Sequence, residues 1–380
     1  MRVSALSGPS AAMALLRDDP YKRRRRALPG RGASINPPPR FEPHYREEDA
    51  ETAPLAEEDP PSRPETTLTR EACRSAISWN ESPDLGFDRS ANPYRGCEHG
   101  CIYCYARPSH AYLGLSPGLD FETRLFFKPD IAERLREEWR KPGYGKDVRP
   151  LALGTNTDPY QPAERRLRLT RAILEAALDF RHPVTIVTKS AGILRDLDLL
   201  AELAAKNLAR VSLSVTTLDR DLARIMEPRA ATPSRRLEAL RALRERGVPA
   251  GILYAPVIPG LNDEELESVL AAARDNGAAF AGWVLLRLPH EVKDLFRVWL
   301  ETHLPARAPR VLGLLGACRG EGLNDPRFHH RMRGEGVYAR LIAQRFRRAS
   351  TRLGFEAPPP LACDLFAPPG ERRQLAFPLD

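Results

Sequence analysis

The sequence predicts an α/β protein that folds as an incomplete (βα)6 barrel of the TIM type, with a disordered N-terminal tail and a C-terminal helical extension. From about residue 90, short apolar or β-branched runs alternate with helical patterns, and this alternation indicates parallel βαβ units. Six such pairs occupy residues 88–303, which gives 36 residues for each pair. A closed eight-fold barrel of ordinary size uses about 31. The alternative is a doubly wound open sheet.

The expected strands are apolar or β-branched and lie at residues 91–96, 151–154, 184–188, 210–215, 250–256 and 283–288. The expected helices lie near residues 129–140, 163–180, 191–206, 233–246, 262–275 and 290–303. In the third helix, leucines recur at helical spacing and form one apolar face. Gly247 and Pro249 end the fourth helix before the fifth strand begins.

The composition indicates a globular protein with a sizeable core. Of the 380 residues, 42% are hydrophobic and 28% are charged, which excludes a wholly disordered or collagen-like chain. No apolar run approaches the roughly 18 residues of a membrane-spanning helix. The apolar residues 12–16 are followed by two aspartates, so they make a poor signal peptide. We therefore expect a cytoplasmic protein without a membrane partner.

Both ends of the chain differ from the predicted barrel at residues 71–303. Residues 1–70 contain 11 of the 36 prolines, and we expect them to be a disordered, proline- and charge-rich tail. Residues 304–380 form the extension, in which eight arginines and only Glu335 fall within residues 327–352. An apolar stripe there predicts an amphipathic helix that Gly354 ends and that docks on the barrel or covers its open side. The stripe is Tyr338, Ile342, Phe346, Ala349 and Leu353.

Three of the six cysteines lie in one short loop at residues 97–104. Cys97, Cys101 and Cys104 have the spacing C-x3-C-x2-C, and Gly96 and Gly100 allow the backbone to turn tightly around them. Three thiolates in eight residues can converge on one soft metal centre. One interpretation is a structural zinc site completed by His99 or His110. The other is an iron–sulfur cluster that keeps one iron without a protein ligand.

The loop, with Tyr103 directly before its last cysteine, resembles the signature of the radical S-adenosylmethionine (radical SAM) superfamily. The resemblance implies that Cys97, Cys101 and Cys104 hold a [4Fe-4S] cluster. It also implies that S-adenosylmethionine (SAM) chelates the open iron and is cleaved reductively to a 5′-deoxyadenosyl radical, which abstracts hydrogen from a substrate. A reductant such as flavodoxin or ferredoxin is then an expected partner.

Residues 92–97, 101–105 and 155–162 are similar to the branch of this superfamily that contains spore photoproduct lyase, and the resemblance covers roughly residues 90–300. It implies that six residues contact SAM. Two tyrosines, Tyr103 and Tyr105, would lie on its adenine or ribose side. Thr157 and Asp158 would lie at its amino group, and Lys189 and Ser214 at its carboxylate and ribose. An ordinary alternative for Asp158 is a turn before Pro159.

One departure from this branch concerns the substrate. The lyase uses a cysteine in its second-strand segment to return a hydrogen atom to the product, whereas residues 154–157 here read Gly-Thr-Asn-Thr. Photoproduct repair by the same route is therefore not expected. Cys318 is a candidate substitute donor, with core packing as the alternative. Arg287, where the sixth strand ends, is a candidate contact for a substrate or cofactor carboxylate.

The resulting hypothesis is a lyase-like radical SAM enzyme whose substrate is unknown, with DNA or RNA as candidates. The arginines of residues 327–352 could neutralise nucleic-acid phosphates or simply form a solvated helix face. One rival is radical modification of a protein or small metabolite. A rival outside the enzymes is a zinc-stabilised nucleic-acid-binding protein without catalysis.

Overall fold

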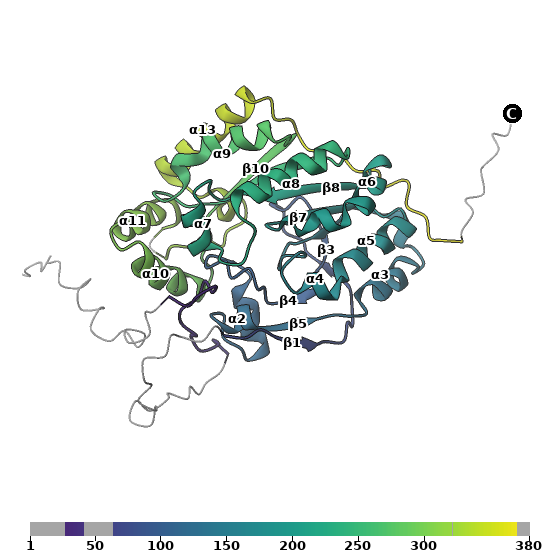
Figure 1. Ribbon diagram of the computed structural model, residues 1–380, viewed down its shortest axis with the longest axis horizontal. Coiled ribbons are helices and arrows are strands. Elements are labelled where there is room, and N and C mark those ends of the chain that lie inside the picture. Colours follow the sequence, from purple (N-terminus) through teal and green to yellow (C-terminus); the bar gives the residue numbers. More distant parts are fainter. Residues whose placement is uncertain (1–26, 42–63, 321, 371–380) are drawn as a thin grey trace, which may run out of the picture.

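The computed structural model describes residues 27–41, 64–320 and 322–370 (Figure 1). Its centre is a seven-stranded sheet in the order β10-β9-β8-β7-β6-β3-β2. Six of these strands are parallel and follow one another along the chain: β3 (Arg89–Ala91), β6 (Leu151–Leu153), β7 (Val184–Thr188), β8 (Ala209–Ser214), β9 (Ala250–Val257) and β10 (Phe280–Leu285). The short strand β2 (Ile77–Trp79) pairs antiparallel with β3 at one edge.

The strand order confirms the six-unit α/β architecture. A doubly wound sheet reverses its strand order at a switch point, whereas this sheet runs through its parallel strands in chain order. Within the described residues β2 and β10 are the two edges of the sheet, so the barrel is open between them.

The helices between the strands lie close to the predicted stretches. They are α3 (Ile131–Trp139), α4 (Glu164–Leu167) with α5 (Leu169–Asp179), α6 (Leu197–Ala205), α8 (Pro233–Glu245), α9 (Leu266–Asp275) and α10 (Val292–His303). Short 3-10 turns precede two of them, η4 (Ala191–Asp196) and η5 (Asp263–Glu265). Helix α7 (Arg220–Met226) was not predicted. Its N-terminus is capped by Asp219, whose carboxylate accepts from the backbone N–H groups of Asp221 and Leu222.

The first predicted strand is wrong in its bounds, because residues 91–96 divide between two sheets. After β3 the chain turns at Asn92-Pro93, and Tyr94–Arg95 forms β4 in a second sheet of order β1-β5-β4, with β1 (Thr67–Arg70) and β5 (Arg124–Phe127). Proline has no N–H to donate to a continuous ladder. Helix α2 (Asp120–Thr123) contacts β5 and the 3-10 helix η2 (Arg107–Leu113), whereas η3 (Tyr144–Lys146) contacts α3. The last predicted strand is also displaced, since β10 begins at Phe280.

The expectation of a disordered tail is wrong for its described parts, residues 27–41 and 64–70. Residues 27–41, called the strap below, pack onto the domain with Ala33 and Ile35 almost fully buried. Residues 67–70 form β1. The average composition of residues 1–70 did not predict that the strap is ordered, because two apolar side chains and backbone hydrogen bonds are enough to dock a short segment. Residues 1–26 and 42–63 lie outside the described residues.

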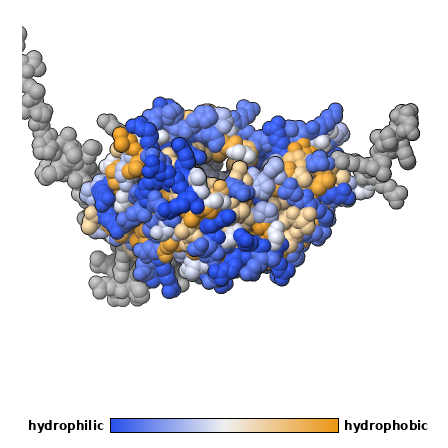
Figure 2. All heavy atoms as spheres, turned by 90° about the horizontal axis from the view of Figure 1, so that it is seen from above, coloured by the Kyte–Doolittle hydropathy of each residue, from blue (hydrophilic) through white to orange (hydrophobic). Residues whose placement is uncertain are grey.

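The C-terminal extension folds as α11 (Ala308–Arg319), α12 (His330–Arg333) and α13 (Gly336–Arg352). Helix α13 lies beside α9 and also contacts α11 and β10 (Figure 1). Its predicted apolar stripe faces the core, and Gly354 has a positive φ of 67° just after its end. The face that carries α13 and α9 is mostly hydrophilic, with apolar residues in small separate groups (Figure 2).

The extension also connects to the opposite edge of the sheet. Asp84, between β2 and β3, accepts hydrogen bonds from Arg331 Nε at 2.7 Å and from the backbone N–H of His329 at 3.2 Å. Residues after β10 therefore bridge the open side of the barrel. In the described ranges, no helix combines the length and apolarity needed to cross a membrane.

Candidate functional site

The cysteine loop follows β4 and turns tightly at two glycines. Gly96 and Gly100 have φ values of 77° and 67°, which favour glycine. A Cβ on Gly96 would lie 2.8 Å from the carbonyl oxygen of Phe121, and one on Gly100 would lie 2.8 Å from Glu122 Oε2. The backbone N–H of Cys97 donates to that same Phe121 carbonyl at 2.9 Å. The loop is thus pressed against α2 with no room for side chains at the two turns.

All three thiols of the loop have raised pKa values. Burial is the largest cause at each, and Asp158 and the other two cysteines raise the pKa of Cys97 further. The pKa of Cys101 rises to about 12 because of burial and the charge of Glu227, although Lys189 opposes this. Buried thiols of this kind become thiolates only when a cation compensates the charge. The mutual effects also show that the three sulfur atoms lie near one another.

The three sulfur atoms do not all lie as close together in this structure as the ligands of a single zinc ion. Tetrahedral ligands at about 2.3 Å from zinc lie about 3.8 Å apart. Among the described residues, the one group of three ligand atoms within 4.8 Å of one another is Asp325, His330 and Glu335, so the three cysteines are more widely separated. A larger centre such as a cubane cluster fits this separation.

Each histidine proposed as a fourth zinc ligand has one ring nitrogen paired within the protein. His99 Nδ1 pairs with Asp158 Oδ2 at 3.3 Å. His110 Nε2 lies 3.0 Å from the carbonyl oxygen of Arg124, and burial lowers the pKa of His110 to about 4. His110 Nδ1 is buried and has no hydrogen-bond partner among the described residues, so these contacts do not decide between a zinc ion and a cluster.

A glutamine that the motif analysis did not single out holds the loop on both sides of its first cysteine. Gln161 Nε2 donates to the carbonyl of Gly96 at 3.2 Å, and its Oε1 accepts from the backbone N–H of Glu98 at 2.9 Å. Gln161 is fully buried. The signal was present in the sequence, because Gln161 belongs to the 155–162 segment that carries the family resemblance.

Replacing Gln161 with leucine should loosen the loop without preventing folding. Gly96 O and Glu98 N–H would lose their partner in a buried place, which costs about 3 kcal/mol in total. We expect the variant to bind less iron after anaerobic reconstitution while keeping its far-UV circular dichroism spectrum. Gln344→Leu, at an exposed position of α13, is the control. Full iron content in Gln161→Leu would contradict this role.

The opposite side of the loop is held by a buried ion pair and the strap. Arg107 Nη2 contacts Glu122 Oε1 at 2.5 Å, and Arg107 Nε donates to the carbonyl of Cys101 at 3.0 Å. Glu122 also accepts from the backbone N–H groups of Gly32 and Ala33 at 3.0 and 2.9 Å. Because the pair is fully buried, these extra hydrogen bonds are needed to compensate its desolvation. Ala33 and Ile35 share an apolar cluster with Cys101, Ile102 and Tyr103.

Asp158 connects the loop after β6 to the end of β7. Its Oδ1 accepts from Thr188 Oγ1 at 2.6 Å and from the N–H of Tyr160 at 2.9 Å, and its Oδ2 accepts from the N–H of Lys189 at 2.7 Å. Burial opposes ionisation of Asp158, but His99 and these donors outweigh it and lower its pKa to about 2. Both carboxylate oxygens are therefore occupied by the protein.

Tyr103 leads into a second buried charge network. Its hydroxyl donates to Glu227, and Arg236 Nη2 pairs with the other oxygen of that carboxylate. Burial favours the neutral form of Glu227, but Arg236 and then Lys189 outweigh it and hold the pKa of Glu227 below its usual value. Arg236 also donates to the carbonyl of Ser214 at 2.9 Å. Sequence reasoning missed Glu227 and Arg236, which no motif marks.

The remaining predicted cofactor contacts differ in the hydrogen bonds and the exposure of their side chains. Lys189 Nζ lies 5.7 Å from the ring centre of Tyr103, and no described residue accepts a side-chain hydrogen bond from it. Ser214 is 1% exposed at the end of β8. Thr157 Oγ1 donates to the carbonyl of Tyr94 at 3.1 Å. The Tyr105 hydroxyl donates to the carbonyl of Thr155, and the Tyr105 side chain is 48% exposed.

The structure does not bring Cys318 to the cysteine loop. Cys318 is 2% exposed on α11 and belongs to the main core cluster with Leu285 and Ala339. Burial raises the pKa of its thiol. Packing in the core therefore accounts for Cys318, the alternative noted from the sequence.

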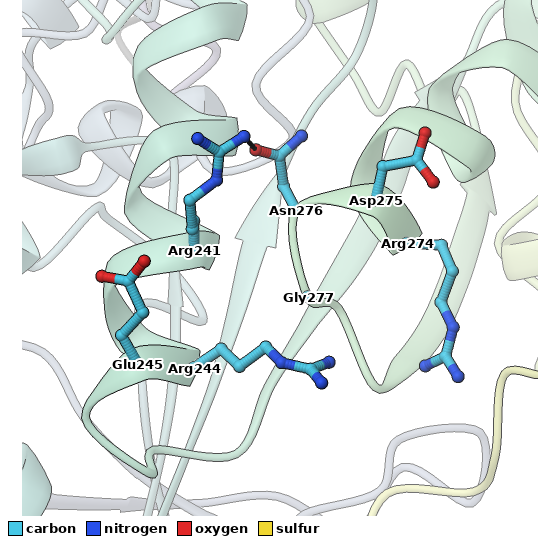
Figure 3. Close-up of a pocket in the computed structure, with 7 residues that line it drawn as sticks. All are labelled: Arg241, Arg244, Glu245, Arg274, Asp275, Asn276 and Gly277. Carbon is cyan, nitrogen blue, oxygen red and sulfur yellow. Dashed lines mark hydrogen bonds between the residues drawn. The ribbon is translucent and has the colours of Figure 1, made fainter.

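A separate hollow of about 500 Å³ lies between the C-terminal ends of α8 and α9 (Figure 3). Arg244 and Arg274 flank Gly277 there, and Arg241 Nη2 donates to Asn276 Oδ1 at 2.8 Å. These residues precede β9 and β10, so they lie at the end of the sheet opposite to the cysteine loop. Barrel enzymes carry their chemistry at the C-terminal ends of the strands, and we place no active site in this hollow.

The comparisons with known proteins identify the superfamily. The family model described as Radical SAM superfamily matches residues 91–273, from the end of β3 into α9. An uncharacterised protein of Mycobacterium tuberculosis is 38% identical over 243 residues, which cover 63% of this chain and 70% of the relative. The chain belongs to the radical SAM superfamily. A further uncharacterised relative, from Methanocaldococcus jannaschii, is 29% identical over 174 residues, 46% of this chain and 62% of that protein.

A solved structure with a similar fold supports the fold of this radical SAM protein. Spore photoproduct lyase complexed with dinucleoside spore photoproduct matches with a TM-score of 0.50 and 18% identity, over 76% of this chain and 80% of that one. The radical SAM methyltransferase TsrM from Kitasatospora setae, solved with tryptophan substrate and a SAM analogue, has a TM-score of 0.38 and 17% identity, over 52% of this chain and 36% of that one. Radical SAM proteins typically bind a [4Fe-4S] cluster and SAM.

Proposed function

We propose that this chain is a radical SAM enzyme whose [4Fe-4S] cluster is held by Cys97, Cys101 and Cys104. The observation that carries the proposal is the loop of three buried cysteines in a chain that belongs to the radical SAM superfamily. The catalytic unit is residues 71–303, and residues 304–380 are an extension that covers its open side.

When bound, the cluster supplies one electron that cleaves SAM into methionine and a 5′-deoxyadenosyl radical, which takes a hydrogen atom from the substrate. Lys189 is the residue we assign to the carboxylate of SAM, because its ammonium group has no hydrogen-bond acceptor among the described residues and lies over Tyr103. Ser214 and Tyr105 contribute to the ribose and adenine side.

Asp158 and Tyr103 act mainly by positioning their neighbours. Both oxygens of Asp158 are occupied, so we infer that it serves the amino group of SAM through His99 and fixes the backbone of Lys189. Thr157 fixes the β4 backbone beside the loop. Tyr103, tied to Glu227, sets the position of the segment between Cys101 and Cys104. The expected electron donor is a flavodoxin or ferredoxin, and the expected location is the cytoplasm.

Product analysis tests this activity directly. Anaerobically reconstituted protein, mixed with SAM and dithionite, should release 5′-deoxyadenosine and methionine in equal amounts, because both come from one cleavage. Omission of dithionite should abolish both products. A reconstituted protein that contains iron and sulfide and yet releases neither product would contradict the enzyme assignment.

Nucleic acid is the substrate class that the charge distribution favours. Arg340, Arg347 and Arg348 on α13 are exposed, and none has a carboxylate partner among the described residues. Their exposed guanidinium groups can contact phosphates. Repair of a spore photoproduct by the route of the lyase remains unexpected, because residues 154–157 contain no thiol.

Deuterium transfer distinguishes this class from a protein or a metabolite. Deuterated DNA, RNA and protein would be incubated separately with the reconstituted enzyme, and deuterium in 5′-deoxyadenosine identifies the substrate. For a nucleic acid, binding should weaken steeply as salt increases. Deuterium transfer from protein alone, or binding that salt does not change, would contradict a nucleic-acid substrate.

A further inference from the structure

A half-buried arginine without an acceptor lies beside the last residue of the cysteine loop. Arg287 follows β10, and its guanidinium carbon is 5.5 Å from the ring centre of Tyr105. Its Nε is buried and has no hydrogen-bond partner, and its Nη1 contacts only Met332 Sδ, at 3.9 Å. In the described part of the chain, no carboxylate or carbonyl oxygen accepts from this side chain.

Two further arginines, Arg319 and Arg331, and one carboxylate, Asp84, lie around Arg287. Arg319 donates hydrogen bonds to the backbone carbonyls of Leu285 and Leu286, at 2.7 and 3.0 Å. Arg331 is neutralised by Asp84. Burial and then the charge of Arg331 lower the pKa of Arg287. A partly desolvated cation in such surroundings is stabilised when an anion binds to it.

We propose that Arg287 binds a phosphate group of the substrate beside the ring of Tyr105. The inference rests on the proposed radical SAM activity and adds a named contact for its substrate. A guanidinium offers parallel N–H donors that match two oxygens of a phosphate. The adjacent ring of Tyr105 is 48% exposed and can stack a base. We prefer a phosphate to an isolated carboxylate as the ligand, because a nucleotide would bind the Arg287 guanidinium through its phosphate and the Tyr105 ring through its base.

Position supports a role for this site in substrate binding. Arg287 stands where β10 ends and Tyr105 stands one residue after Cys104, so the pair spans the open side of the barrel at the C-terminal ends of the strands. Lys189, which we assign to the cofactor, follows β7 in the interior of the sheet. The Arg287 site is thus at the edge strand β10, next to Met332 of the extension, whereas the cofactor residue lies inside the sheet.

Binding of small probes tests the site separately from catalysis. The reconstituted protein with SAM bound would be titrated with four deoxyribonucleotide homodinucleotides, which carry one phosphodiester each, and with their uncharged methylphosphonate analogues. The variants are Arg287→Met, Arg287→Lys and, as the control on an exposed position at the end of α8, Arg246→Met. In the same samples, 5′-deoxyadenosine formed without substrate reports whether the cofactor site is intact.

We expect Arg287→Met to weaken binding of the preferred phosphodiester about tenfold or more, to leave binding of its methylphosphonate analogue unchanged, and to keep 5′-deoxyadenosine formation. Arg287→Lys should retain part of the affinity, and Arg246→Met all of it. The proposal is overturned if the wild-type protein binds none of the dinucleotides, or if Arg287→Met weakens both analogues equally or neither. Arg287-dependent binding of N-acetylglutamate in their place would also overturn it. Loss of 5′-deoxyadenosine in the wild type would instead refute the proposed activity.

Discussion

Replacing Cys101 with alanine is expected to abolish both iron–sulfur cluster binding and SAM cleavage. A cluster held by three cysteines that loses one ligand keeps only two protein bonds. Anaerobically reconstituted Cys101→Ala should therefore lack the brown colour of the wild type, bind little iron and sulfide, and form no 5′-deoxyadenosine with dithionite. Absorption near 400 nm, metal analysis and chromatography of the products measure these outcomes.

Cys363→Ala is the matched control for this variant. Cys363 is partly buried, and its thiol donates to the carbonyl of Leu361 at 3.6 Å. This variant should keep full iron content and full cleavage activity. Wild-type turnover in Cys101→Ala would defeat the ligand assignment, and equal loss in both variants would point to general unfolding.

Adding a methyl group at Gly32 is expected to detach the strap from the cysteine loop. A Cβ at Gly32 would lie 1.8 Å from the carbonyl oxygen of Gly100, which is a backbone atom that cannot rotate away. We expect Gly32→Ala to lower the free energy of unfolding by about 3 kcal/mol. Because Glu122 would lose its bonds from Gly32 and Ala33, the loop should also release its iron faster to a chelator.

Gly86→Ala provides the comparison for Gly32→Ala, since nothing lies within 4 Å of a Cβ at Gly86. Its stability should change by less than about 0.5 kcal/mol. Urea denaturation and the rate of iron transfer to a chelator measure the two effects. If Gly32→Ala matches Gly86→Ala in both, the strap does not support the loop.

The fold was predictable where strand and helix patterns are long. The six parallel strands appear in the predicted order, and β7 occupies the predicted residues 184–188. The prediction was wrong where tertiary contacts decide the structure. Residues 91–96 contain Pro93 and divide between two sheets, and the strap is held by Glu122, 89 residues away along the chain. Local composition contains no information about such a distant partner.

In the candidate site, too, local sequence patterns were predictable and distant tertiary contacts were not. The cysteine spacing marks the proposed cluster ligands, because the chemistry requires those residues within a few positions of one another. Gln161, Glu227 and Arg236 act on the loop from positions 57 to 132 residues beyond Cys104. Their role depends on how the strands are arranged. Arg287 was considered only because it follows a strand, and its missing acceptor is visible only in the folded chain.

Electron paramagnetic resonance of the reduced protein tests the central claim most directly. Three cysteine ligands leave one iron of the proposed cluster accessible to SAM. The anaerobically reconstituted, dithionite-reduced protein should therefore give the signal of a [4Fe-4S]+ cluster, and addition of SAM should change its g-values. A protein that holds one zinc ion and no iron, or a cluster signal that SAM leaves unchanged, would contradict the proposed site.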